Sequence, residues 1–165
     1  CDWSSDVCSS DLPDSDTGDV LVYLAGTSGS VSGGDVTAVE TAITKSAVPL
    51  TVTPTVQSAA NKVVAVTYTL WIYDSLGEDA STVEATVLAA LEAMFAARPI
   101  GGDIKAPATS GKLYKSMIES VIRAAYPLHA FAVSVSAPAS DTSLANGEVA
   151  TLGAVTPTIT FEAAP

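Results

Sequence analysis

The chain has 165 residues, of which 48% are hydrophobic and 15% are charged, so it carries enough apolar side chains for the core of a folded domain. Its formal net charge of −11 argues against a surface that follows nucleic-acid phosphates, because such a surface needs clustered Lys and Arg. No run of about eighteen apolar residues occurs, so the sequence predicts no transmembrane helix.

The first twelve residues, CDWSSDVCSSDL, resemble the translation of a sequencing adapter rather than a natural protein segment. We therefore expect residues 1–17 to be an artefactual or disordered N-terminal tail, and residues 18–162 to form a single α+β region. Both cysteines of the chain, Cys1 and Cys8, lie in this tail. The sequence therefore offers no disulfide framework for the folded part.

Residues 19–25 (DVLVYLA) predict a short apolar strand, and the Gly- and Ser-rich residues 26–34 predict a flexible loop. Asp35 is the expected cap of a helix that runs to about residue 46, because apolar residues then recur at helical spacing. These apolar residues are Val36, Val39 and Ile43. Pro49 and Pro54 favour an extended crossing segment, since proline lacks an amide donor and disfavours helical geometry before it.

The strongest strand signal in the chain is VVAVTYTLWIY, residues 63–73. Side chains alternate between the two faces of a strand, so Leu70 and Ile72 belong to one face and Trp71 and Tyr73 to the other. Both faces are substantially apolar. We therefore predict a central strand that helices cover on one side and that is partly covered on the other.

Two helices are predicted after the central strand. Ser81 and Glu84 have the spacing of a capping box at the start of the first helix, which ends at Arg98 before a Pro- and Gly-rich loop. Its apolar stripe comprises Val83, Val87, Leu91 and Phe95. The second helix is expected to begin near Ser110 and to end before Pro127. The residues that we expect it to bury are Leu113, Tyr114, Met117, Ile118, Val121 and Ile122.

The remaining segments predict two more strands. Residues 129–136 (HAFAVSVS) alternate, which places Phe131, Val133 and Val135 on one side of a strand. A polar loop follows, and residues 148–161 predict the final strand. The expected order is β-α-β-α-α-β-β. This order favours an α+β two-layer sandwich, in which helices pack on one face of a mixed β-sheet.

Few residues could carry catalysis. His129 is the single histidine, so a Ser-His-Asp arrangement or a histidine-containing zinc site would depend on it, and its place at a strand start favours a structural role. Residues 26–30 (GTSGS) lie where phosphate loops occur, yet they lack the Lys-Ser/Thr of a P-loop and the three-glycine dinucleotide spacing. We therefore predict no catalytic, cofactor-binding or metal-binding residues, no cofactor, and no enzymatic activity.

Several strings, in their order along the chain, resemble the C-terminal portion of the baseplate J-like family of contractile-tail proteins. They are NKVVAVTYTLWIYD (61–74), the Ala-rich helix (80–97), PIGGDI (99–104), LYKSMIESV (113–121) and GEVATLGAVTPTITF (147–161). The resemblance covers residues 18–161. It implies a wedge component that binds neighbouring subunits around the tail tube, with no catalysis and no cofactor.

Trp71 and Tyr73 are the candidate interface residues, because aromatic side chains are enriched at the centres of protein interfaces. A second core layer is an equally open interpretation of the two rings. The partners implied by the resemblance are other baseplate wedge proteins, with self-association as a further option, no nucleic acid and no membrane span. The expected location is the virion tail baseplate, after assembly in the bacterial cytoplasm. The alternative is a receptor- or glycan-binding tail module.

Overall fold

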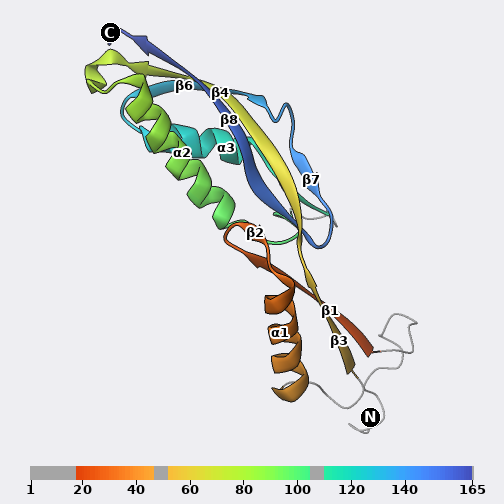
Figure 1. The fold of residues 1–165 in the computed structure, drawn as a ribbon. Helices are drawn as coiled ribbons and strands as arrows, with labels where there is room; N and C mark the ends of the chain where they lie inside the picture. The colour runs from red at the N-terminus through yellow and green to blue at the C-terminus, as the bar shows by residue number, and fades with distance from the viewer. Residues whose placement is uncertain (1–17, 47–51, 105–109, 165) are drawn as a thin grey trace, which may run out of the picture. The chain divides into compact units, whose positions relative to one another are not determined.

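We describe the protein from a computed structural model, which defines residues 18–46, 52–104 and 110–164 (Figure 1). These described residues form three α-helices and eight β-strands. The predicted α+β class is therefore confirmed, and the predicted order of elements is roughly matched. The expected N-terminal tail, residues 1–17, lies outside the described residues.

Contacts divide the chain into two compact units. Of the described residues, the first comprises 18–22, 32–46 and 52–57, and the second comprises 23–31, 58–104 and 110–164. The sequence predicted one α+β region over residues 18–162. That these residues fold as one cooperative domain stays a prediction.

Helix α1 (Gly33–Ser46) is the main element of the first unit, which also holds the beginning of strand β1 (Gly18–Gly26) and most of strand β3 (Val52–Ser58). The helix begins earlier than the sequence predicted, because Ser32 precedes it and exchanges hydrogen bonds with Asp35. The Ser32 hydroxyl donates to the Asp35 carboxylate at 2.7 Å and accepts from the Asp35 amide at 3.3 Å. Asp35 therefore lies in the first turn rather than at the cap.

A small antiparallel hairpin belongs to the second unit. The end of β1 pairs with β2 (Gly29–Ser30), with Ala25 opposite Ser30. The sequence predicted a plain flexible loop here. The hairpin is held to the chain around the start of β4 (Ala60–Tyr73), because the Ser30 amide donates to Asn61 Oδ1 at 2.7 Å and the Ala59 amide donates to the Leu24 carbonyl at 2.7 Å.

The second unit is built around a three-stranded mixed sheet (Figure 1). Its central strand β4 pairs antiparallel with β6 (Ala130–Ala137) and parallel with β8 (Glu148–Glu162). The predicted central position of the VVAVTYTLWIY segment is therefore confirmed. Strands β6 and β8 form the two edges of this sheet.

Helices α2 (Ala80–Ala96) and α3 (Lys115–Ala125) cover one face of this sheet. Helix α2 contacts β8 and α3, and α3 also contacts β6. The even-numbered face of β4 enters the core, and its buried members are Val64, Val66, Tyr68, Leu70 and Ile72. The predicted α2 stripe of Val83, Val87, Leu91 and Phe95 is buried against it. Each such large apolar side chain contributes about 1.5–3 kcal/mol on burial.

The start of α2 differs from the predicted capping box. Asp79 is the N-cap, and its carboxylate accepts from the Thr82 amide at 2.8 Å. The Ser81 hydroxyl also donates to Asp79, at 2.8 Å, rather than capping the helix itself. These two donors, the amide first, lower the pKa of Asp79. Asp and Ser are comparably good caps, so the local pattern did not decide between them.

Helix α3 begins later than predicted, at Lys115 rather than near Ser110. The preceding residues form strand β5 (Gly111–Leu113), which pairs with β7 (Thr142–Leu144). Leu113 is buried as expected, although from a strand. Of the other residues expected on this helix, Ile118 and Ile122 are fully buried, and Met117 and Val121 pack partly against the core. Pairing with a distant strand overrode the helical pattern of this segment.

Candidate functional site

Trp71 and Tyr73 lie on the face of β4 opposite the buried Leu70 and Ile72, and both rings are partly exposed. Tyr73 stacks on Phe131 of β6, with ring centroids 4.7 Å apart and the rings inclined by 24°. We call Trp71, Tyr73 and Phe131 the aromatic surface. Offset stacking of two rings contributes about 0.5–1.5 kcal/mol beyond area burial, so the stack holds both rings in a fixed orientation.

Phe131 was expected on the same side as Val133 and Val135, and that expectation is wrong. The β4–β6 register shifts between Trp71 and Ile72, whose partners are Ala132 and Ala130. Phe131 thus falls in the irregularity and remains 41% exposed, whereas Val135 is buried. An inserted strand residue re-aims the neighbouring side chains, and the simple alternation in the sequence carries no sign of it.

A shallow depression of about 510 Å³ adjoins the aromatic surface. Glu162 and Ala163, at the end of β8, line it together with the three rings and Ala132. Glu162 stands beside Tyr73 in the parallel β4–β8 register. Ring faces and one carboxylate in a shallow site can stack on apolar or planar groups and accept hydrogen bonds.

Threonines continue from the aromatic surface along the same sheet face. In the β4–β8 register Thr67 pairs with Thr156, Thr69 with Thr158, and Trp71 with Thr160. Side chains at paired positions of parallel strands share a face, so hydroxyl and methyl groups cover the sheet next to the rings. The result is an aromatic centre with a polar border, which is the usual composition of a protein interface.

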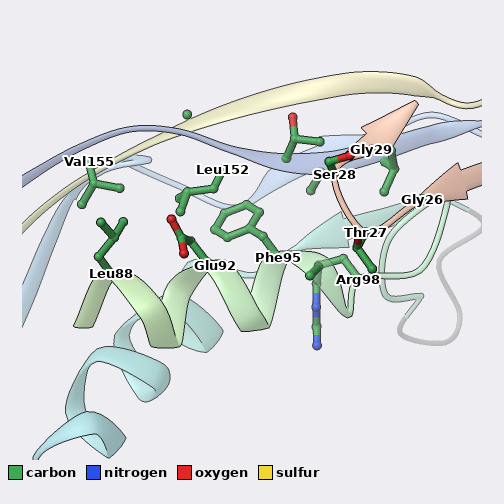
Figure 2. A pocket seen from close by; sticks show the side chains of 15 residues that line it. Gly26, Thr27, Ser28, Gly29, Leu88, Glu92, Phe95, Arg98, Leu152 and Val155 are labelled. Atoms are coloured by element: carbon green, nitrogen blue, oxygen red, sulfur yellow. The ribbon is translucent and has the colours of Figure 1, made fainter. Parts of the chain in front are cut away.

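A groove of about 470 Å³ is the second candidate site (Figure 2). One wall is the segment 149–155 of β8, and the other is α2 with Leu88, Glu92 and Phe95. The turn of the β1–β2 hairpin, residues 26–29, also lines it. In Figure 2 the Phe95 ring and the Glu92 carboxylate rise from α2 toward β8. The volume lies in the range of ligand-binding clefts.

Arg98 also lines the groove but is engaged elsewhere. Its Nη1 lies 3.0 Å from Asp103 Oδ2, and its Nε donates to the Met94 carbonyl at 3.2 Å. Glu92 forms no ion pair with any residue of the described part of the chain. The negative charge of Glu92 is therefore the one in this groove that is open to a ligand.

Two further residues, His129 and Tyr126, link elements of the second unit. His129 takes part through its backbone, since its carbonyl accepts from the Tyr73 amide at 3.1 Å. The Tyr126 hydroxyl donates to Glu78 Oε2 at 2.7 Å and so joins the end of α3 to the start of α2. Burial, together with the Glu78 carboxylate, raises the pKa of Tyr126.

Within residues 18–46, 52–104 and 110–164, no three His, Cys, Asp or Glu residues gather as a metal site would require.

None of the helices in the described residues has the length and apolar character needed to cross a membrane. Comparison of the chain with protein-family models finds no match, and comparison with curated proteins finds none either.

Sequence reasoning identified Trp71 and Tyr73 but missed Phe131, Glu162 and the groove. The position of Phe131 depends on the irregularity in strand β6, and the position of Glu162 beside Tyr73 depends on the register between β4 and β8, which lie far apart in the sequence. Leu88 gave a usable signal, because it lies beside the Val87 stripe and widens the apolar face of α2 beyond the part that the core covers.

Proposed function

We propose that this chain is a structural component of a phage or phage-like contractile-tail baseplate and that it acts through protein–protein assembly contacts. The resemblance of its ordered strings to the baseplate J-like family suggests the particle. The observation that carries the assembly role is the aromatic surface, where Tyr73 and Phe131 stack at 4.7 Å on the sheet face opposite α2 and α3. Rigid, half-exposed aromatic rings surrounded by polar side chains are typical energetic centres of interfaces.

The proposal is tested by co-expressing the chain with the products of the reading frames that flank its own. We expect a complex that is isolated through a tag on this chain and that keeps a constant stoichiometry in size-exclusion chromatography. Phe131→Ala should weaken the complex by about thirtyfold in Kd, which corresponds to a hot-spot loss of about 2 kcal/mol. It should lower the melting temperature of the free chain only slightly, because the ring is 41% exposed.

Leu128→Ala is the matched control, because Leu128 is an 85% exposed apolar residue outside the aromatic surface. It should leave the Kd unchanged. The same comparison applies to Trp71→Ala and Tyr73→Ala. If these variants lose intrinsic stability as much as they lose assembly, the rings belong to the core and the proposed interface is wrong. Absence of the chain from purified tail particles would reject the baseplate role itself.

A receptor- or glycan-binding tail module is the second candidate function. The depression beside Trp71 and Tyr73, with the Glu162 carboxylate at its border, favours it. Sugars offer apolar faces to aromatic rings and hydroxyl groups to carboxylates. Reproducible binding of the isolated chain on a glycan array, abolished by Trp71→Ala and retained by Leu128→Ala, would favour this function over assembly.

A further inference from the structure

The groove between β8 and α2 follows the edge of the strand rather than one of its faces. A strand that lines a cavity with one face contributes every second residue, because its side chains alternate. Here five consecutive residues, 149–153, line the groove, and Val155 follows. Strand β8 is an edge of the three-stranded sheet, so the groove exposes the side of its backbone that faces away from β4.

The backbone along this edge is accessible for pairing from Thr151 onward, since Val149 and Ala150 are only 4% and 2% exposed. In the described part of the chain, no backbone group of residues 149–156 bonds outside the β4–β8 ladder. An edge strand of this kind presents a row of free amides and carbonyls that a further strand can pair with. Pro157, which removes a donor, lies just beyond the groove. The proline-free part of the edge therefore coincides with the groove.

Helix α2 forms an apolar wall of matching length. Leu88, Glu92, Phe95 and Ala96 are spaced four, three and one residues apart, which puts them on one stripe of the helix. From Leu88 to its end at Ala96 the helix rises about 12 Å, and the accessible strand from 151 to 155 extends about 13 Å. Leu88 is 38% exposed although it is a large apolar residue. An extended segment of about four residues fits along both walls.

One end of the groove is closed by a fixed structure. The hairpin turn at residues 26–29 lines it, and Val31, which follows the hairpin, donates its amide to Ser58 Oγ at 2.9 Å. Together with the Ser30–Asn61 bond, this contact attaches the hairpin to the β3–β4 segment. The end wall is therefore built in rather than formed by a ligand. A second copy of the chain would have to fit its own α2 beside this wall, which favours a single strand as occupant.

The charge of the groove defines the occupant further. The Glu92 carboxylate is exposed, points toward β8 in Figure 2 and has no ionic partner in the described residues. The chain as a whole carries a net charge of −11. Charge complementarity therefore favours a Lys or Arg on the ligand, at a position that faces α2.

We propose that this groove binds an extended segment of a partner protein, which adds as a strand to the free edge of β8. The segment places apolar side chains against Leu88 and Phe95 and a Lys or Arg against Glu92. Main-chain hydrogen bonds supply affinity and the alternate side chains supply specificity. The inference deepens the proposed function, on which it rests only for the identity of the donating protein.

The test uses a library of random dodecapeptides displayed on phage, selected against the full chain. We expect binders with alternating apolar residues and one Lys or Arg among the positions that face α2. The selected peptide, synthesised and labelled, should bind one to one. In hydrogen exchange it should protect those amides of residues 151–155 that exchange freely in the unbound chain. N-methylation of alternate peptide amides should abolish binding in one register and preserve it in the other, because only one row of amides faces β8.

Two variants of α2, one that lines the groove and one that does not, test whether binding uses the helical wall. Leu88→Asp should weaken peptide binding about tenfold or more, since it puts a charge in the apolar wall. Ala89→Asp adds the same charge at an exposed residue next along the helix that does not line the groove, and it should change the Kd less than twofold. Glu92→Gln should weaken binding of the basic peptide about threefold to fivefold, the range of an exposed ion pair.

Three results would overturn the inference. They are a selection without a one-to-one binder, protection that appears only outside residues 151–155, and equal effects of Leu88→Asp and Ala89→Asp. Self-association through β8, seen by light scattering and lost on Leu88→Asp, would replace the partner segment with a second copy. Because no tail protein enters the experiment, its failure leaves the baseplate assignment standing, and rejection of that assignment leaves peptide binding measurable.

Discussion

Tyr68 is the residue whose chemistry fits its surroundings least. Its ring is buried in the core between β4 and the helices, and its hydroxyl has no hydrogen-bond partner among the described residues. Burial, with a smaller effect of the nearby Glu84 carboxylate, raises the pKa of Tyr68 to about 12. The ring contributes apolar packing, whereas a buried hydroxyl without a partner costs about 1–3 kcal/mol.

Tyr68→Phe is therefore expected to leave the free energy of unfolding at pH 7 unchanged or to raise it by about 1 kcal/mol, because the ring stays and the hydroxyl is removed. The raised pKa also decides whether the free energy of unfolding rises or falls with pH. The unfolded tyrosine ionises near pH 10 and the folded one near pH 12, so Tyr68 destabilises the fold increasingly as the pH rises through this window. Denaturant unfolding of both proteins between pH 7 and pH 11 measures this effect.

The variant should lose less stability than the parent protein above pH 10, since it lacks this titration and shares all the others. A Tyr68→Phe protein that is less stable at pH 7 by more than 1 kcal/mol would mean that the hydroxyl is satisfied in solution. Parallel pH profiles would mean that Tyr68 ionises as readily in the folded protein as in the unfolded chain.

At the scale of elements, the PIGGDI string acts as a backbone junction. Gly101 and Gly102 both have positive φ, 80° and 74°, a conformation that glycine adopts without steric cost. The Gly101 amide donates to the Glu148 carbonyl at 2.7 Å, and Asp103 pairs with Lys112. A Cβ at Gly111 would collide with the Gly101 carbonyl oxygen. Glycines therefore occupy the point at which three segments meet. These segments are the loop after α2, strand β5 and the start of β8.

Gly111→Ala is expected to destabilise the protein by about 2–3 kcal/mol, because the added methyl group meets backbone that cannot move without breaking these bonds. Gly33→Ala is the matched control, since a Cβ at Gly33 meets nothing within 4 Å and its φ is ordinary. It should be neutral or slightly stabilising at the start of α1. Thermal and denaturant melts of both variants measure the difference, and equal effects would show that the junction yields easily.

At the scale of the whole molecule, the two units differ in how their helices are held. Helix α2 has five buried side chains, among them Val83, Val87 and Leu91. The described side chains of α1 include no buried one, and only Val36, Val39 and Ile43 are even partly covered. Most helical stability in proteins comes from a buried face rather than from intrinsic propensity.

Amides in the middle of α1 are therefore expected to exchange at least ~10-fold faster with solvent deuterium than amides in the middle of α2. Hydrogen exchange of the free chain followed by peptide mass spectrometry measures both helices in one experiment. Equal protection of the two helices would mean that the two units open together as one cooperative domain, as the sequence led us to expect for residues 18–162.

Local patterns predicted the elements whose neighbours lie close in sequence. The alternation of residues 63–73 indicated a two-sided central strand, and the stripe of α2 indicated its buried face, because side-chain periods of 2 and 3.6 are properties of the backbone alone. Capping was less certain, since Asp79 and Ser81 are both suitable caps within one turn. Residues 111–113 read as helix because the pattern contains no information about their partner, strand β7.

The sequence by itself determined the α+β class, the central strand and the placement of Trp71 and Tyr73 on the face opposite Leu70 and Ile72, because these follow from periodicity along one segment. Only the tertiary structure decided that Phe131 stacks on Tyr73, that Glu162 stands beside it, and that α2 runs along the free edge of β8. Each of these depends on register or packing between segments far apart in the chain. A single strand irregularity is enough to move a side chain from one face to the other.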